Sequence, residues 1–347
     1  MITEVLRFGD ENKMKKMIFL GNGFTIDFLN QLDDVDDIDV INLFKNGDDI
    51  EWPENNISGF LSYRHCPNLW NLGIRPYESK ENNYAIFEDI ITCANMSNEF
   101  PQLNIENKIY LKAYKELINY LKFLFISYNK NFSFNESSIK EWGWYKFFFK
   151  LEKDDGISEV NIITFNYDIF LEQILQTIGI DFNISAFENK SSKFNIIKPH
   201  GSISFRHKTK LESTAYRIKY ELESLITNVT DYEIDYNFDY TKEIPIVSAL
   251  LPPAGDSSRF NKLSWAKTLR DVVMEKTKQL NSNDDIIICG LSYWHVDRQE
   301  IDKYLTRINE NVNVYLINPN PPSVFNAVLT TIFKNVVVYR KSDNLGK

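Results

Sequence analysis

The sequence has little cysteine, no long hydrophobic run and no excess of positive charge. Its 347 residues include three cysteines, Cys66, Cys93 and Cys289. Their wide spacing fits neither a zinc finger nor a disulfide framework, and it suits a reducing compartment. No stretch approaches the ~18 consecutive apolar residues that a membrane helix needs. These shortages predict a cytoplasmic protein that does not span a membrane.

The charge balance narrows the choice of partners. Lysine and arginine number 39 against 48 aspartates and glutamates, which gives a formal net charge of −9. This balance argues against a protein that binds nucleic acid over a large part of its surface. It does not exclude a local basic patch or a partner that binds nucleic acid. A hydrophobic content of 43% and a charged content of 25% are ordinary for a soluble globular protein.

Short apolar runs alternate with helical patterns along the chain. Ile286–Cys289 is a continuous apolar run, as expected for a parallel strand buried on both faces. Similar runs predict strands at 17–20, 160–163, 196–198, 312–317 and 336–338. Because helical segments separate most of these strands, the sequence predicts an α/β fold with a mostly parallel sheet.

Two polar turns follow predicted strands. Phe165-Asn166-Tyr167-Asp168 comes between a strand and a helix, and Pro199-His200-Gly201-Ser202 follows the next apolar run. In open α/β sheets, ligands bind at the carboxyl ends of the strands. We therefore predict that an amide and an imidazole face one crevice, which makes this crevice the candidate active site.

A glycine turn follows the first predicted strand. Gly21-Asn22-Gly23 precedes a helix predicted to begin near Phe24. A strand, a glycine turn and a helix can bring backbone N–H groups against a phosphate. The third glycine of the dinucleotide fingerprint is missing, so a purely structural tight turn is an equally good interpretation.

Structural roles compete with the catalytic ones at each polar position. Asp168 could cap the helix that it precedes, because aspartate is a favoured N-cap residue. Asn166 could serve as a turn residue, since asparagine tolerates tight backbone geometry. His200, before a glycine, could be a hydrogen-bonded loop histidine. The combination of these turns, rather than any one of them, favours an active site.

The whole chain, residues 1–347, is expected to form one domain with two insertions. Residues 43–151 are predicted to be mainly helical, and Tyr110–Tyr128 has the spacing of an amphipathic helix. The many aromatic residues of this insertion suggest a role in gating, regulation or self-association. The polar stretch Arg206–Glu243 is expected to be irregular or helical.

With these residues in view, the chain resembles the sirtuin superfamily, in particular its bacterial NAD-consuming branch, which acts in antiphage defence. The resemblance rests on five short motifs that occur in family order. They are Gly21-Asn22-Gly23 for the glycine-rich turn, Thr164-Phe165-Asn166-Tyr167-Asp168 for the Thr-Gln-Asn-Ile-Asp loop, His200-Gly201, Gly290-Leu291-Ser292 for the Gly-Thr-Ser turn, and Ile317-Asn318.

The resemblance implies a Rossmann-type sirtuin-like fold and roles for these residues. His200 would be the catalytic base and Asn166 would orient the ribose or a water molecule, while Asp168 would bind the nicotinamide carboxamide. The pyrophosphate would lie against Gly21, Asn22 and Gly23. The adenosine half would lie near Gly290, Ser292 and Asn318.

Two departures from the family bear on the reaction. Residues 203–243 stand where sirtuins that deacylate proteins carry a zinc module, and this stretch has no cysteine. Phe165 replaces the glutamine of the loop, and the acidic-Phe-Arg segment is not evident. We therefore expect no zinc, and NAD as a substrate of a glycohydrolase that yields nicotinamide and ADP-ribose.

Two alternatives remain open: a protein deacylase or ADP-ribosyltransferase, and a non-catalytic module that senses NAD or ADP-ribose. The resemblance also implies an antiviral effector that depletes cellular NAD. Such an effector is expected to form a homo-oligomer, or to act with a defence partner such as an infection sensor, a guide-binding protein or a ring-forming ATPase.

Overall fold

The computed structural model describes residues 13–32, 37–99, 108–130, 132–220, 227–252 and 264–345. Its centre is a seven-stranded sheet with the strand order β14-β13-β12-β1-β4-β6-β5. Every neighbouring pair in this sheet is parallel. The expected α/β fold with a mostly parallel sheet is confirmed, and the main sheet is parallel throughout.

The strands of the main sheet alternate with helices along most of the chain. The strands are β1 (Met14–Leu20), β4 (Ile157–Thr164), β5 (Phe182–Ile184), β6 (Phe194–Ile197), β12 (Asp285–Cys289), β13 (Asn313–Ile317) and β14 (Asn335–Tyr339). The helices between them are α1 (Asn22–Leu29), α7 (Phe170–Thr177), α8 (Ser264–Lys278), α9 (His295–Leu305) and α10 (Ser323–Ile332). The short η5 (Ser342–Asn344) follows β14.

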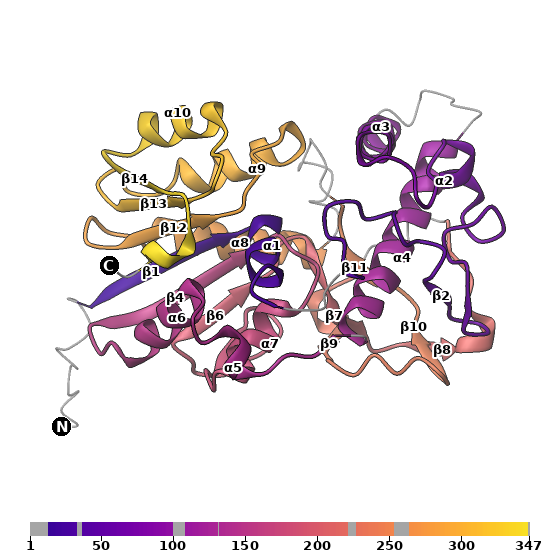
Figure 1. Ribbon diagram of the computed structural model, residues 1–347, viewed down its shortest axis with the longest axis horizontal. Helices are drawn as coiled ribbons and strands as arrows, with labels where there is room; N and C mark the ends of the chain where they lie inside the picture. The colour runs from indigo at the N-terminus through magenta and orange to yellow at the C-terminus, as the bar shows by residue number, and fades with distance from the viewer. Residues whose placement is uncertain are drawn as a thin grey trace, which may run out of the picture.

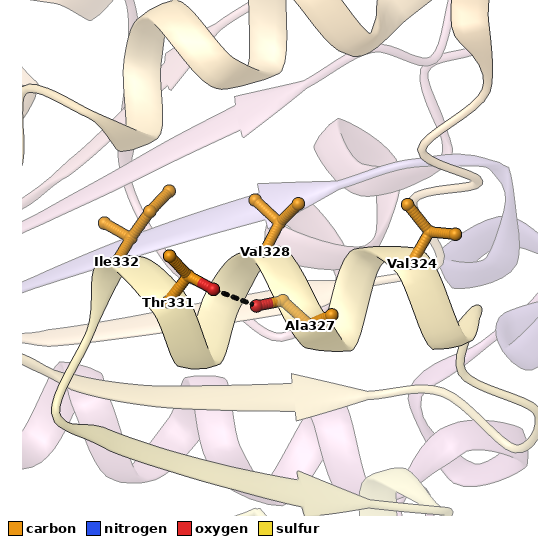
Figure 2. Close-up of a pocket in the computed structure, with 5 residues that line it drawn as sticks. All are labelled: Val324, Ala327, Val328, Thr331 and Ile332. Atoms are coloured by element: carbon orange, nitrogen blue, oxygen red, sulfur yellow. Dashed lines mark hydrogen bonds between the residues drawn. The ribbon is translucent and has the colours of Figure 1, made fainter.

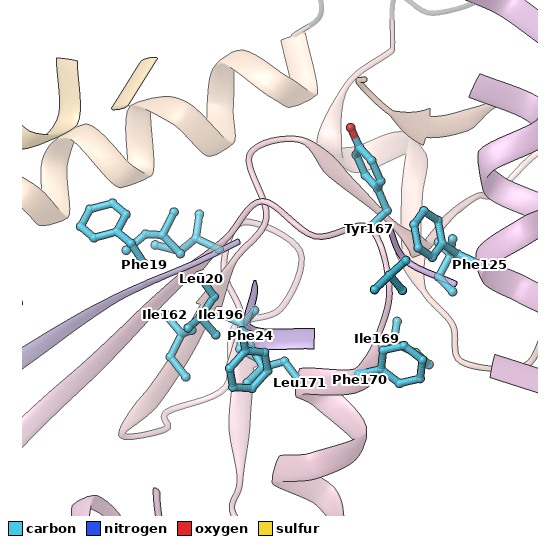
Figure 3. Close-up of a cluster of buried hydrophobic side chains, with 14 of the residues drawn as sticks. Phe19, Leu20, Phe24, Phe125, Ile162, Tyr167, Ile169, Phe170, Leu171 and Ile196 are labelled. Atoms are coloured by element: carbon cyan, nitrogen blue, oxygen red, sulfur yellow. The ribbon is translucent and has the colours of Figure 1, made fainter. Parts of the chain in front are cut away.

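The core lies where the central strands meet their covering helices. Ile18 of β1, Ile162 of β4 and Ile196 of β6 are fully buried, as expected for strands with helices on both faces. Figure 3 shows Phe19 and Leu20 of β1 beside Ile162 and Ile196, and Phe24 of α1 close to Leu171 of α7. Burial of these apolar side chains fixes the register of β1, β4 and β6, and with it the position of the turns that follow them.

A second group of elements stands beside the sheet, at the right of Figure 1. Its longest helix, α4, contacts α2, α3, β7 and β11. This group contains α2 (Pro67–Asn71), α3 (Lys80–Glu99) and α4 (Ile109–Lys130), with a hairpin of β2 (Glu51–Trp52) and β3 (Ile57–Ser58). Two further helices between α1 and β4, α5 (Glu136–Ile139) and α6 (Gly143–Lys153), lie on the side of the main sheet. This stretch is helical as expected, and its limits of 43 and 151 as an insertion stay a prediction.

The described part of the stretch Arg206–Glu243 is mostly irregular, as expected, but it also contains short strands that were not expected. Its described part contributes short strands to two small antiparallel sheets, β11-β7-β9 and β10-β8, beside two single 3-10 turns. The strands are β7 (Gly201–His207), β8 (Lys210–Glu212), β9 (Tyr232–Ile234), β10 (Glu243–Pro245) and β11 (Ser248–Leu250), and the turns are η1 (Ser213–Ala215) and η3 (Val229–Asp231). Strands of three residues carry too few alternations to show in the sequence pattern.

The order in which strands are added to the sheet reverses at β1. From β1 the chain continues to β4, β5 and β6 on one side of that strand, and then to β12, β13 and β14 on the other. Such a switch point opens a crevice outside the carboxyl ends of the strands. The described part of the chain contains no helix that is long and apolar enough to cross a membrane.

Candidate active site

The predicted site residues follow five neighbouring strands of the parallel sheet, β13, β12, β1, β4 and β6. Because the sheet is parallel, all the turns lie at the same edge. In strand order they are Asn318 after β13, Gly290 and Ser292 after β12, Gly21, Asn22 and Gly23 after β1, Asn166 and Asp168 after β4, and His200 after β6. Their roles in binding or catalysis stay predictions.

The turn after β1 packs tightly on the turn after β12. The backbone N–H of Gly21 donates to the carbonyl of Cys289 at 2.9 Å, and that of Gly23 donates to the carbonyl of Gly290 at 3.3 Å. A Cβ atom added at Gly23 would lie 2.5 Å from the Cα of Gly290, and one at Gly21 would lie 2.6 Å from the Gly290 carbonyl oxygen. These glycines are therefore needed for contact between two turns, whatever ligand the crevice takes.

The helix after this turn begins earlier than predicted. α1 starts at Asn22, with Gly21 as its N-cap, so Gly23 lies inside the first helical turn. The first turn of the helix contains glycine and asparagine, so the helical spacing of apolar residues becomes visible only from Phe24 onward. Asn22 is exposed, and its Nδ2 donates to the carbonyl of Val40 at 2.8 Å.

Asn166 is bound to the turn after β1 through its amide nitrogen. The Nδ2 group donates to the carbonyl of Gly21 at 3.1 Å and to the Oγ1 of Thr25 at 3.0 Å. The backbone N–H of Asn166 donates to the Oγ1 of Thr164 at 3.2 Å. Asn166 is half-buried, and its Oδ1 makes no hydrogen bond with any residue that the structure describes. The orientation of the amide thus leaves its oxygen without a partner among the described residues.

Asp168 is buried beneath this amide. One carboxylate oxygen accepts from the hydroxyl of Thr25 at 3.1 Å, and the other accepts from the backbone N–H of Phe170 at 3.1 Å. The second contact satisfies the first backbone donor of α7, although the N-cap residue of that helix is Ile169 rather than Asp168. Its predicted contact with a nicotinamide carboxamide stays a prediction.

Burial raises the pKa of Asp168 from 3.8 to about 6, although the nearby Lys198 ammonium opposes this rise. Between these two pH values the folded protein binds more protons than the unfolded chain. The free energy of unfolding should therefore fall as the pH rises from about 4 to about 6.

Asp168→Asn removes this titration and should abolish the fall in stability that it causes. Relative to the wild type, the variant should gain on the order of 2 kcal/mol of stability between pH 4 and pH 7. Denaturant unfolding across this range measures the difference, and Asp155→Asn on the exposed surface controls for the change in charge. A stability difference that does not vary with pH would contradict the assigned titration.

His200 is 3% exposed and lies in a buried polar network. Its Nε2 lies 3.1 Å from the Oε2 of Glu300 on α9, and Glu300 also binds the guanidinium of Arg270 on α8 at 2.9 Å. The edge of Phe165, in the turn after β4, meets the imidazole ring with 5.0 Å between centroids. The Nδ1 of His200 is buried and has no hydrogen-bond partner among the described residues.

A buried ion pair supports the turns after β4 and β6. The ammonium of Lys198 lies 2.8 Å from the Oε1 of Glu172, and both side chains are fully buried. The same ammonium donates to the backbone carbonyl of Asp168 at 2.5 Å. Lys198 therefore connects the segment before His200 to the turn that carries Asn166, which restricts how far the two turns can move apart.

The network contains several residues that the sequence analysis did not identify. Thr25, Lys198, Glu172, Arg270 and Glu300 are all buried, although their side chains are polar. A charged residue on the apolar face of a helix is the one signal that could have found Glu172 and Glu300. Sequence alone does not show which distant residues pair with them.

The residues predicted for the adenosine half lie at the periphery of this network. Ser292 is exposed, in a loop where Tyr293 has a positive φ of 48° and stacks on Phe325. Asn318 is half-buried, and its Oδ1 accepts from the backbone N–H of Asn320 at 2.9 Å. Among the described residues, neither side chain makes a hydrogen bond to Asn166 or His200.

A separate hollow on the outer helix lacks the chemistry of a nucleotide site. It measures about 340 Å³ and lies along α10 alone (Figure 2). Its lining consists of Val324, Ala327, Val328, Thr331 and Ile332. No charged side chain is present there to meet a phosphate, so the strand-end crevice remains the candidate site.

No group of three or more histidine, cysteine, aspartate or glutamate side chains in the described ranges could hold a metal ion. Cys66 and Cys289 are buried, and Cys93 is half-buried. The expectation that the protein works without zinc stays a prediction.

Comparison with known families now identifies part of the chain. Residues 160–332 match the family of SIR2-like domains. The match covers 173 of the 347 residues and includes Asn166, Asp168, His200, Gly290, Ser292 and Asn318. It begins within β4, so the glycine turn after β1 lies outside it. No curated protein matches the chain.

Proposed function

Residues 160–332 are a SIR2-like domain, which implies an activity that involves NAD, and we propose that the protein is an NAD glycohydrolase. In this reaction the bond between nicotinamide and ribose breaks, and water takes the place of nicotinamide. The products are nicotinamide and ADP-ribose.

The reaction needs no strong general acid, but it needs a site that holds the ribose and the water in the correct positions. Positive charge develops on the anomeric carbon as the bond breaks, as in glycoside hydrolysis. Nicotinamide leaves as a neutral molecule, so its departure needs no added proton. The protein must hold the ribose and direct water, and a base must remove a proton from that water or from a ribose hydroxyl.

One observation carries the proposal: two polar atoms without protein partners follow neighbouring strands in register. Ile163 of β4 pairs with Ile197 of β6, and Asn166 and His200 each lie three residues beyond these partners. The Oδ1 of Asn166 and the Nδ1 of His200 have no hydrogen-bond partner among the described residues. Both atoms can accept a hydrogen bond from a ribose hydroxyl or a water molecule.

The contacts of Asn166 and His200 support different roles for the two residues. Thr25 and Gly21 hold the amide of Asn166 so that its oxygen is the free acceptor, which suits it to orient a hydroxyl group. The imidazole of His200 is suited to act as the general base, a role worth roughly 10²–10⁴ in rate.

Chromatography of NAD incubated with the full chain tests the proposal. We expect nicotinamide and ADP-ribose to form in equal amounts. Asn166→Ala should lower turnover by about 10²-fold, because a misplaced ribose or water loses the advantage of orientation. Asn195→Ala is the matched control, since Asn195 is also half-buried but lies within β6 and contacts Asn183.

Other products would redirect the assignment. Intact NAD together with the processing of an acyl-lysine peptide would support a deacylase, and ADP-ribose on a protein would support a transferase. Tight binding of NAD or ADP-ribose without turnover, under every condition tried, would support a sensing module. Each of these results would contradict the glycohydrolase proposal.

We also propose that the activity serves defence by exhausting cellular NAD, and that a partner or self-association controls it. The fold supports one part of this proposal: Tyr84 of α3 contacts Trp294 in the loop after β12, with 4.7 Å between ring centroids. A change in the helical layer can therefore reach the edge of the crevice. Light scattering with and without candidate partners measures the assembly, and a monomer under all conditions would contradict self-association.

A further inference from the structure

Glu300 and Arg270 form a buried pair behind His200. Glu300 is 5% exposed and Arg270 is 8% exposed. The guanidinium binds the carboxylate through two contacts, Nε to Oε1 and Nη2 to Oε2, each 2.9 Å long. This fork geometry fixes the plane of the carboxylate. The hydroxyl of Tyr304, one helical turn further along α9, donates to Oε1 at 2.6 Å.

The carboxylate of Glu300 is ionised in this setting. Burial alone would raise its pKa, but the positive charge of Arg270, which contacts both carboxylate oxygens, acts in the opposite direction and the pKa lies below its ordinary value. An ionised carboxylate can only accept hydrogen bonds. The Nε2 of His200, 3.1 Å from Oε2, must therefore carry a hydrogen and donate it.

This contact determines which nitrogen is basic. In a neutral imidazole only one nitrogen carries a hydrogen, and the other keeps a free lone pair. When Nε2 donates to Glu300, the lone pair is on Nδ1. That atom is buried and has no partner among the described residues, so it is the ring nitrogen left to act as an acceptor or a base.

We propose that Glu300, held in place by Arg270, is a positioning residue that fixes His200 as the Nε2–H tautomer and presents Nδ1 as the base. The inference rests on the proposed function for its catalytic consequence. When Nδ1 takes a proton from water or a ribose hydroxyl, the imidazole becomes a cation, and the carboxylate of Glu300 stabilises that cation at Nε2. The proton remains on His200, and Glu300 stays ionised.

Glu300→Gln tests the role with little change in shape. A glutamine amide can donate to Nε2, which favours the Nδ1–H tautomer and removes the lone pair from the crevice. An equivalent change behind the histidine of a serine protease lowers kcat by ≈ 10⁴ through the wrong tautomer. For Glu300→Gln we expect kcat to fall at least ~10²-fold, while the dissociation constant for NAD, measured by calorimetry, stays the same.

Tyr304→Phe is the matched control for lost packing and lost stability. Tyr304 is as buried as Glu300, but its hydroxyl binds the other carboxylate oxygen, and among the described residues it makes no hydrogen bond to His200. This variant removes one buried hydrogen bond and keeps the contact between Oε2 and Nε2. We expect it to lose thermal stability and to keep most of its turnover. A loss of turnover that follows stability alone, and is equal in both variants, would overturn the positioning role.

Nitrogen-15 NMR of the imidazole groups reports the tautomer without reference to any reaction. The chain has four histidines, and the signals that His200→Gln removes identify His200. We expect Nε2–H in the wild type and Nδ1–H in Glu300→Gln. A wild-type spectrum with Nδ1–H would overturn the inference even if Glu300→Gln did not fold.

The two proposals can fail separately. An Nε2–H spectrum in a protein that never cleaves NAD would overturn the glycohydrolase and support the tautomer assignment. NAD cleavage that survives Glu300→Gln at full rate would support the glycohydrolase and overturn the positioning role.

Discussion

Replacing His200 with glutamine is expected to lower NAD turnover by roughly 10²–10⁴-fold while NAD still binds. Glutamine is close to histidine in size, and its amide can keep a hydrogen bond to Glu300, so the buried network should survive. An amide has no basic nitrogen and cannot take the proton. Calorimetry with NAD and a nicotinamide-release assay measure the two effects separately.

His207→Asn is the matched control for this variant. His207 is also buried, at 7% exposure, but it lies in the small sheet β11-β7-β9 and its Nδ1 accepts from the backbone N–H of Thr209 at 3.0 Å. An asparagine oxygen can replace that acceptor. Near-wild-type turnover in His200→Gln would show that His200 is a structural loop residue.

Gly23→Ala is expected to destabilise the fold by about 3 kcal/mol, the upper end of the usual cost of overpacking. The added Cβ would lie 2.5 Å from the Cα of Gly290, so one of the two backbone turns must move. The resemblance to sirtuins implies that a side chain here would weaken pyrophosphate binding. The contact with Gly290 adds a direct effect on stability, which denaturant unfolding without any ligand measures.

Gly179→Ala provides the comparison. Gly179 has a positive φ of 73°, but an added Cβ would meet nothing within 4 Å. We expect a cost of about 1 kcal/mol from backbone conformation alone. Equal losses in the two variants would contradict the view that the two turns meet too closely for a side chain.

Much of the sheet follows from local sequence. The apolar runs that contain Ile18, Ile162, Ile196, Ile287 and Leu316 all form strands of one parallel sheet. These runs are mostly apolar because helices or loops cover both faces of the strands. They can therefore be recognised in the sequence without knowing which strands pair with each other. Polar turns after these runs could then be assigned to one edge, because parallel strands end together.

The connections inside the site could not be predicted in this way. The contacts of Glu300 with His200, of Asn166 with Gly21 and of Gly23 with Gly290 join residues that are 100 to 267 positions apart. No local pattern encodes these pairs. The small strands near Tyr232 and Leu211 were missed for a different reason, since three residues give too short an alternation.

The dense aromatic residues before β4 are explained mainly by burial. Trp142, Trp144, Tyr120 and Phe60 are almost completely buried. Tyr63, Tyr77 and Tyr84 are the exposed tyrosines of the described part of that region. The expected self-association of the helical insertion stays a prediction, and its aromatic content alone gives it less support than the sequence suggested.

The order of the strands along the chain sets when the crevice can exist during synthesis. β1 pairs with β12, and Lys16 meets Asp285 across 269 positions. A nascent chain that has not yet reached β12 has no neighbour for one side of β1, no Gly290 for Gly23 to meet and no Glu300 for His200. The proposed cleavage of NAD therefore needs a chain that has been synthesised at least as far as α9, which carries Glu300.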